Sequence, residues 1–206
     1  MKTIITIQHT QSVHHTNGMV GSWTDWDLTD LGKAQAENIG RNLRAETGNQ
    51  DFVLYSSDLR RAQQTAAIVA RYFGISPILK PALRERNLGK SCGKSVQWLR
   101  ANIECQERTV DDKMFHDAES RRDVYDRLRP FFDEMTANPC PQIMIVSHGD
   151  LLSVLNIMLL GLPAESLNRF ELSGLAGGVS HILLQDDGKT VFKRMSDMSY
   201  IELPTS

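Results

Sequence analysis

The stretch that decides the fold is "TIITIQH", residues 3–9. Its β-branched residues predict a strand, yet the apolar run ends abruptly on Gln8 and His9. A strand that ends on a histidine delivers that imidazole into the loop that follows. The surroundings of His9 therefore depend on which other strands lie beside this one.

Outward from this strand, helix-like and strand-like segments alternate along the chain. The further predicted elements are a helix over 28–48, a strand over 52–57, a helix over 58–74, a short strand over 76–83, a helix over 118–135, a buried strand over 141–148, a helix over 150–160 and a hairpin over 177–195. This alternation predicts an α/β fold of three layers, α/β/α, with a mainly parallel central sheet and helices on both faces. Residues 84–117 have no clear period, and we expect a partly helical, lid-like insertion over the sheet there.

Local signals set the predicted ends of the helices. Thr29 is a candidate N-cap, Leu31 belongs to the predicted apolar face, and Gly48 ends the first helix. Pro130 lies inside the predicted helix 118–135 and predicts a kink or a break at about Arg129.

The composition indicates one globular domain that spans residues 1–206. Hydrophobic residues make up 41% and charged residues 23% of the 206 positions, as in ordinary soluble proteins. Because the formal net charge is −2, nothing global draws the chain to nucleic acid or to a membrane, and an anion site must be local. The N-terminal apolar run is too short for a signal peptide, and residues 151–162 are too short to span a bilayer. Three scattered cysteines suggest no disulfide framework and favour a cytoplasmic location.

Candidate functional residues follow three of the predicted strands. His9 ends the first strand, Ser57 ends the second with Arg61 one turn later, and His148-Gly149 follow the strand that begins at residue 141. In parallel sheets, ligands bind at the carboxyl ends of the strands. Two histidines and an arginine that are far apart in the sequence should therefore converge on one edge.

Such an edge suits a phosphate-sized dianion. Arg61 can bind two phosphate oxygens with its planar guanidinium group, and it lies in the first turn of a predicted helix, which favours anions. A neutral imidazole is a competent nucleophile toward phosphorus when its other nitrogen is held as a donor. A protonated second imidazole would stabilise charge on the phosphoryl oxygens. The candidate acid for the leaving group is Glu85, in "LRERNLG", at the start of the insertion.

Five motifs carry a family resemblance over nearly the whole chain. They are Gln8-His9-Thr10-Gln11-Ser12, "LTDLGKAQA" (28–36), "SDLRRAQQTA" (57–66), "AESRRDVYDR" (118–127) and "VSHGDLLSVL" (146–155). In this order and spacing the chain resembles the histidine phosphatase superfamily, the phosphoglycerate mutase-like or two-histidine phosphatases. The resemblance implies a phosphoglycerate mutase-like fold and a phosphatase that hydrolyses phosphomonoesters.

The resemblance also implies roles for individual residues. His9 would be the phosphorylated nucleophile, His148 the second histidine of the phosphate pocket, Arg61 a phosphate ligand and Glu85 the proton donor. Gly149 would belong to the same phosphate pocket. No metal or organic cofactor is expected, and the length fits the phosphatase branch better than the longer mutases.

The first motif departs from the family pattern. The family's first arginine, a phosphate ligand, is Gln8 here, and the usual asparagine falls on His15. By analogy with oxyanion donors, losing a charged phosphate donor costs about 2.7–4 kcal/mol, roughly 10²–10³ in rate. We hypothesise that His15, or its neighbour His14, supplies a proton-bearing donor in its place, with Gln8 as a neutral one. Activity would then fall as the pH rises through the histidine range.

Three alternatives remain open from the sequence. A mutase would return the phosphoryl group to a substrate hydroxyl, and a degenerate binding protein would bind phosphate esters without turnover. A metallohydrolase built on His9, His14 and His15 is disfavoured, because no helix is expected to place them on one face. The partner is a small phosphorylated metabolite whose identity the sequence leaves open, as it does the oligomeric state. Trp23 could stack on a substrate, although core packing is favoured.

Overall fold

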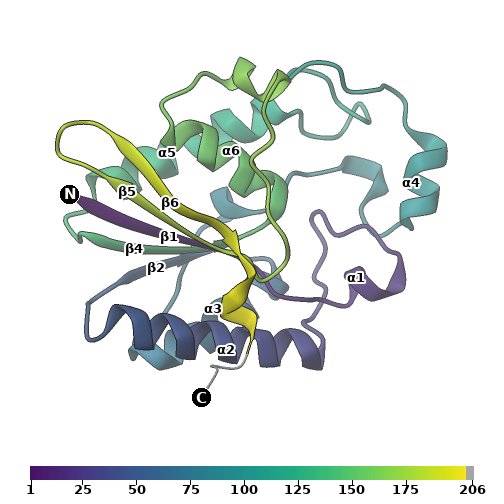
Figure 1. Cartoon of the computed structure of the whole chain (residues 1–206). Helices are drawn as coiled ribbons and strands as arrows, with labels where there is room; N and C mark the ends of the chain where they lie inside the picture. The colour runs from purple at the N-terminus through teal and green to yellow at the C-terminus, as the bar shows by residue number, and fades with distance from the viewer. Residues whose placement is uncertain (203–206) are drawn as a thin grey trace.

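The computed structural model describes residues 1–202, and its centre is a six-stranded sheet in the order β3-β2-β4-β1-β5-β6 (Figure 1). The strands are β1 (Lys2–Gln8), β2 (Val53–Ser56), β3 (Ile78–Leu79), β4 (Gln142–Ser147), β5 (Val179–Leu184) and β6 (Thr190–Asp197). The α-helices are α1 (His14–Asn17), α2 (Asp30–Thr47), α3 (Arg60–Phe73), α4 (Val96–Asn102), α5 (Arg121–Ala137) and α6 (Gly149–Leu159). Short 3₁₀ turns cover Pro81–Leu83, Gly89–Ser91, Ala164–Asn168 and Met198–Ile201.

The sheet is mainly parallel. Strands β3, β2, β4 and β1 run in one direction, whereas β5 pairs antiparallel with both β1 and β6. The predicted hairpin is thus confirmed as β5 and β6, and the two strands form the far edge of the sheet. The three-layer α/β/α architecture predicted from the alternation is confirmed as well.

Each face of the sheet has its own hydrophobic core because side chains alternate along the strands. From β4, Ile143 and Ile145 pack with α5 and α6, whereas Met144 and Val146 pack with α2 and α3. Figure 1 shows these two helix pairs on opposite faces of the sheet. Both faces of β4 are therefore buried, as its continuous apolar run predicts.

The carboxyl ends of three neighbouring parallel strands meet at one edge. In the register, Gln8 of β1 lies beside Ser147 of β4, and Ser56 of β2 lies beside Val146 of β4. The residues that follow these strands are therefore neighbours in space. This register brings His9, Ser57 and His148 to a common place.

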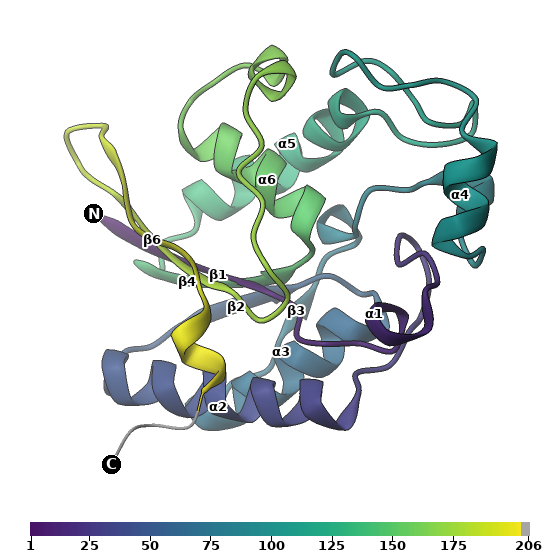
Figure 2. The ribbon, with the colours of Figure 1, turned by 45° about the vertical axis from the view of Figure 1, so that its right-hand side comes forward.

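Residues 84–117 lie beyond this edge together with the segment that contains α1. Figure 2 shows α4 and α1 at the same end of the molecule, and a β-bridge joins Met19 to Ser95. The insertion holds only α4 and a 3₁₀ turn as regular structure. The insertion is therefore partly helical, and its role as a lid stays a prediction.

One local prediction about the helices is wrong, and of the kink or break predicted at Pro130 the break does not occur. Leu31 is 55% exposed and does not belong to the buried face of α2, although Thr29 caps that helix and Gly48 ends it as predicted. Pro130 does not interrupt α5, which continues to Ala137. Tertiary packing explains this, because Leu128, Phe131 and Met135 on either side of the proline are all buried in one core.

The short third strand is smaller than predicted. Only Ile78 and Leu79 pair with β2, and the chain then turns through Pro81–Leu83. Within residues 1–202, no helix is long and apolar enough to cross a membrane.

Candidate active site

His9 is buried and its tautomer is fixed by the backbone. Its Nδ1 lies 2.9 Å from the carbonyl oxygen of Thr10, and because a carbonyl only accepts, Nδ1 carries the proton. Nε2 therefore has the free lone pair, and it accepts a hydrogen bond from Nε of Arg61 at 3.2 Å. Burial, together with the Arg61 charge, holds the pKa of His9 well below its usual range. The ring is a neutral imidazole whose Nε2 faces Arg61.

Arg61 is buried at the start of α3, and backbone carbonyls fix its side chain. Nη1 donates to the carbonyl of Thr24 at 2.7 Å and Nη2 to that of Ser22 at 2.8 Å. Burial lowers its pKa to about 10, so the group is still a cation at neutral pH. Its positive charge is thus held within hydrogen-bond distance of His9 before any ligand arrives, which is the preorganisation that phosphoryl transfer needs.

His148 follows β4 directly and lies beside His9. The two ring centroids are 5.1 Å apart, and Nε2 of His148 lies 2.9 Å from Oγ of Ser57. Its Nδ1 is buried without a hydrogen-bond partner. Burial, Arg61 and His9 hold the pKa of His148 well below its usual range. A buried imidazole nitrogen without a partner is costly unless a ligand satisfies it.

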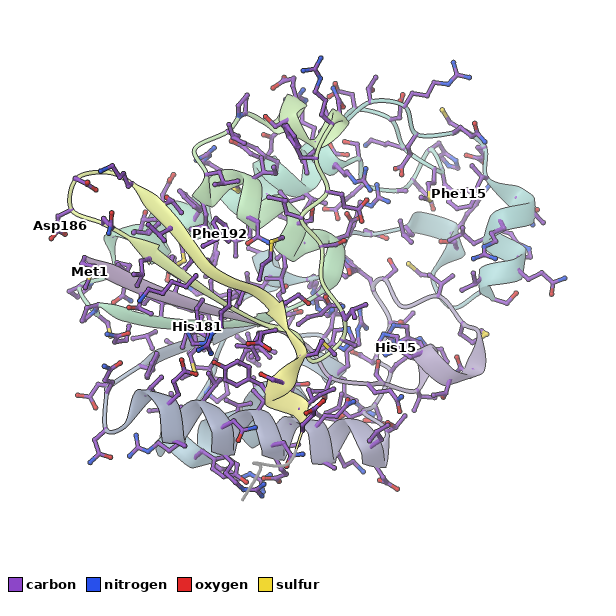
Figure 3. The ribbon with its side chains drawn as sticks, in the orientation of Figure 1. Met1, His15, Phe115, His181, Asp186 and Phe192 are labelled. Atoms are coloured by element: carbon purple, nitrogen blue, oxygen red, sulfur yellow. The ribbon has the colours of Figure 1, made fainter. Side chains whose placement is uncertain are left out.

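His14 and His15 also join this cluster. The His15 ring is stacked on that of His9 with centroids 5.4 Å apart, and the His14 ring lies 4.0 Å from that of His15. Figure 3 shows His15 on the α1 side of the molecule, away from the hairpin near which His181 lies. Gly21 admits the His14 ring, because a Cβ at Gly21 would lie only 2.8 Å from Nε2 of His14.

The surroundings of these two histidines favour their uncharged forms. Burial, His15 and Arg61 lower the pKa of His14 to about 3, and burial and Arg61 lower the pKa of His15. The amide of Ser12 donates to Nδ1 of His15 at 3.2 Å, so the proton of the neutral ring is on Nε2. His15 therefore offers a neutral N–H donor, which differs from the charged donor of the sequence hypothesis.

Glu85 is held against the start of α6. Its carboxylate accepts from the amides of Arg86 at 2.9 Å, Leu151 at 3.1 Å and Asp150 at 3.4 Å. Burial raises the pKa of Glu85, and the neighbouring Asp150 carboxylate raises it further. A carboxyl group with a raised pKa next to a phosphate-sized site is a suitable proton donor.

The Glu85→Gln substitution should separate substrates by their leaving groups. We expect a loss of about 10²–10⁴ in kcat/KM for alkyl phosphates, whose leaving oxygen needs a proton. For p-nitrophenyl phosphate, whose leaving group needs none, the loss in kcat/KM, which reports only the steps up to release of the leaving group, should stay below about tenfold. Because the reactive form is the protonated acid, wild-type kcat for alkyl phosphates should fall as the pH rises through the raised pKa of Glu85. That limb should be missing in the variant, and equal losses on both substrate types would show that Glu85 is not the acid.

Gln8 and Gly149 adjoin the cluster on its α6 side. Gln8 shares the face of β1 that carries Ile4, which packs in the core beneath α6. A Cβ at Gly149 would lie 3.3 Å from Nε2 of Gln8, so the glycine leaves room for the amide. Oε1 of Gln8 is buried without a partner. The position of the expected arginine is therefore filled by a neutral amide beside the start of α6.

The segment that holds Arg61 also contacts Glu85 and its neighbour Arg86, and the sequence reasoning missed it. Ser22 is buried with a left-handed φ of 39°, and its hydroxyl donates to the carbonyl of Arg86 at 2.9 Å. Nε1 of Trp23 donates to the carbonyl of Glu85 at 2.6 Å. Trp23 packs against Arg84 and Arg127, whose guanidinium carbons lie 4.8 and 5.9 Å from its ring. Residues 22–24 thus link Arg61 to Glu85, through contacts with backbone carbonyls that no sequence motif signals.

The three-histidine cluster has the spacing of a metal site. One nitrogen from each of His9, His14 and His15 lies within 4.8 Å of the others, although no single helix carries all three. Two contacts oppose a cation there. Arg61 donates to Nε2 of His9 and its charge repels a metal ion, and Nδ1 of His15 already accepts a hydrogen bond from the amide of Ser12. The donor arrangement fits an anion better.

Two other histidines and Arg60 lie outside the site. His116 is exposed beside Glu104, and His181 is stacked on Tyr200 with ring centroids 5.7 Å apart. Arg60, next to Arg61 in the chain, pairs with Asp27 at the surface.

The family profile of the histidine phosphatase superfamily (branch 1) matches residues 4–197. The chain belongs to the histidine phosphatase superfamily. A 2,3-bisphosphoglycerate-dependent phosphoglycerate mutase of Bartonella tribocorum is 31% identical over 84% of this chain and 88% of its own. A protein of Hydrogenobacter thermophilus described as putative phosphoserine phosphatase 2 is 26% identical over 93% of this chain and 94% of its own.

The fold of this histidine phosphatase also matches solved structures. A mycobacterial glucosyl-3-phosphoglycerate phosphatase superposes with a TM-score of 0.82, covering 95% of this chain and 99% of its own at 23% identity. The phosphoglycerate mutase-like fold implied by the five motifs is confirmed.

Proposed function

We propose that this histidine phosphatase hydrolyses a small phosphorylated metabolite through a phosphohistidine on His9. The observation that carries the proposal is the pairing of His9 with Arg61. The backbone fixes the proton on Nδ1 of the buried neutral ring, and the guanidinium faces the lone pair of Nε2. The nucleophilic nitrogen of His9 and the cation of Arg61 are thus adjacent, as an in-line attack on phosphorus requires.

The first half-reaction follows from the chemistry of these groups. Nε2 of His9 attacks phosphorus, the bond from phosphorus to the leaving oxygen breaks, and Glu85 gives its proton to that oxygen. The Arg61 cation and an N–H donor on His148 stabilise the charge on the phosphoryl oxygens, and the unpartnered Nδ1 of His148 supports that role. In the second half-reaction water attacks the phosphohistidine and the P–N bond breaks. The proton of the water goes to the Glu85 carboxylate, and the lone pair returns to Nε2.

His15 and Gln8 would supply neutral donors where the family has its arginine. The stacked ring of His15 bears its proton on Nε2, and the amide of Gln8 lies beside Gly149. Hydrogen bonds between neutral groups are about half as strong as charge-assisted ones. We therefore propose that this site binds phosphate more weakly than a site of the same shape that has the arginine.

A double-mutant cycle tests this substitution of donors. Gln8→Arg should raise kcat/KM, by up to about 10²-fold, because it restores a charged donor. His15→Asn should lower kcat/KM by about tenfold in the Gln8 protein and much less in the Gln8→Arg protein, since the new cation makes the imidazole donor redundant. Additive effects in the cycle would mean that His15 does not replace the arginine.

Acid-sensitive labelling tests the proposed reaction as a whole. The protein is incubated with a ³²P-labelled phosphomonoester mixture and the reaction is quenched rapidly. We expect a base-stable, acid-labile label on the peptide that contains His9. Labelling and phosphate release should be unaffected by EDTA, because no step uses a metal ion. Loss of activity with chelator would instead favour the metallohydrolase, and binding of phosphate esters without label or release would favour a degenerate binding protein. Transfer of the label to an added alcohol in preference to water would favour a mutase.

The cysteines support a cytoplasmic location. Cys92, Cys105 and Cys140 are all free thiols, as is usual in a reducing compartment.

A further inference from the structure

We propose that the alcohol portion of the substrate carries no carboxylate, and that this enzyme hydrolyses phosphate esters of neutral or ammonium-bearing alcohols. The inference rests on the proposed function, since it takes Glu85 as the group that protonates the leaving oxygen. A general acid must lie within hydrogen-bond reach of the atom that it protonates. The first atoms of the leaving group therefore lie next to Glu85, where the local charges select among substrates.

A connected group of ion pairs surrounds Glu85. Asp150, whose amide contacts the Glu85 carboxylate, pairs with Nε of Arg86 at 2.8 Å and with Nε of Arg121 at 3.4 Å. Arg86 pairs in turn with Glu107 at 2.5 Å, and Arg121 with Glu171 at 3.7 Å. We call these residues, with Glu85, the acid cluster. It joins the insertion, the start of α5, the start of α6 and the loop that contains Glu171.

Carboxylates outnumber cations in the acid cluster. Glu85, Asp150, Glu107 and Glu171 contribute four carboxyl groups, whereas Arg86 and Arg121 contribute two guanidinium groups. Even with Glu85 protonated as the acid, three carboxylates face two cations. Arg86 is also inaccessible to a substrate, with only 5% of its side chain exposed. A substrate carboxylate beside Glu85 would meet net negative charge.

The other two arginines near Glu85 are also paired. Arg84 makes two hydrogen bonds with the Asp58 carboxylate, at 2.7 and 2.6 Å. Arg127, which donates to the carbonyl of Glu85, is bound to Glu119 at 2.7 and 3.0 Å. Bidentate pairs of this kind are strong and geometrically specific. Among residues 1–202, Arg61 is thus the one cation of this neighbourhood that has no carboxylate partner. In the proposed reaction Arg61 binds the phosphoryl group, so it is not free to bind a substrate carboxylate.

Two matched pairs of phosphate esters test the proposal. O-phosphoserine differs from O-phosphoethanolamine by one carboxylate, and 3-phosphoglycerate differs from glycerol 3-phosphate by a carboxylate in place of a hydroxymethyl group. We expect kcat/KM to favour O-phosphoethanolamine and glycerol 3-phosphate by at least about tenfold within their pairs. Equal values within the pairs, or a preference for the carboxylates, would overturn the inference.

The Glu171→Gln variant links the preference to the acid cluster. Glu171 is 61% exposed and lies outside the core, so its replacement should leave the fold intact. Removing its charge leaves Arg121 paired with Asp150 alone and lowers the negative charge of the acid cluster by one, so the discrimination against both carboxylate substrates should narrow by about threefold or more. Glu134→Gln removes another exposed carboxylate from an ion pair, with Lys80, and should leave the ratios unchanged. Identical ratios in wild type and Glu171→Gln would show that the acid cluster does not set the preference.

The labelling experiment keeps the two proposals separate. With p-nitrophenyl phosphate as a probe that has no carboxylate, an acid-labile label shows that the phosphohistidine reaction operates whatever the outcome of the matched pairs. Label together with a carboxylate preference would therefore refute only the substrate class. Absence of label and of turnover on every ester would refute the proposed function itself, and with it the role of Glu85 on which the inference rests.

Discussion

Replacing His9 by alanine should lower kcat by at least about 10⁴-fold and abolish the acid-labile label, because no other group can take the phosphoryl group from the same position. His148 is the nearest competing imidazole, with its ring centroid 5.1 Å from that of His9. Its Nε2 is engaged with Ser57, and it has no contact with the Thr10 carbonyl that fixes the proton of His9. Single-turnover rates and label stoichiometry measure both effects.

The His9→Ala result needs a control for the loss of a buried ring. His116→Ala removes an exposed imidazole far from the cluster and should leave kcat and labelling unchanged. Thermal unfolding of His9→Ala should stay cooperative, since the cavity opens at the edge of the sheet and not in either core. Retained labelling in His9→Ala would assign the phosphohistidine to another residue, with His148 the first to examine.

The sequence predicted the place of the site because the topology is simple. Once β1, β2 and β4 are read as parallel strands, the residues that follow them must meet at one edge. Gln8↔Ser147 and Ser56↔Val146 are the register pairs that bring His9, Ser57 and His148 together. Burial patterns specify that register strongly, since a shift by one residue would turn Ile143 and Ile145 to the wrong face.

Other features depend on tertiary contacts that no local pattern encodes. Pro130 predicts an interruption of α5, yet the packing of its buried neighbours keeps the helix continuous. Ser22 adopts a left-handed φ of 39°, a backbone conformation that a serine at this position does not predict. The lowered pKa values of His14 and His15 arise from partial burial and the charge of Arg61, which become visible only when the fold brings α1 near Arg61. Likewise, the acid cluster brings together carboxylates from three separate segments of the chain, and only the folded structure shows that they are neighbours.

Arg61→Met should lower kcat/KM by about 10³–10⁵, the range found when a cation that stabilises the transferred phosphoryl group is lost. The side chain makes three directed hydrogen bonds, to His9 and to the carbonyls of Ser22 and Thr24. Arg61→Lys should remain within about tenfold of Arg61→Met, because an ammonium cannot reproduce this planar geometry. Steady-state kinetics on p-nitrophenyl phosphate measure the losses without involving the proton donor.

The same variant should change the pH dependence in a defined direction. Arg61 is the second cause, after burial, that lowers the pKa of His9, so its removal should raise that pKa. A larger share of His9 is then protonated at low pH, and the acidic limb of the pH–rate profile should move to higher pH. Arg60→Met is the matched control, since Arg60 is the preceding residue but pairs with Asp27 at the surface, 55% exposed. It should change kcat/KM by less than about twofold. If Arg60→Met and Arg61→Met lost activity equally, the loss would reflect the general charge of α3, and the fixed guanidinium beside His9 would not be the source of phosphate binding.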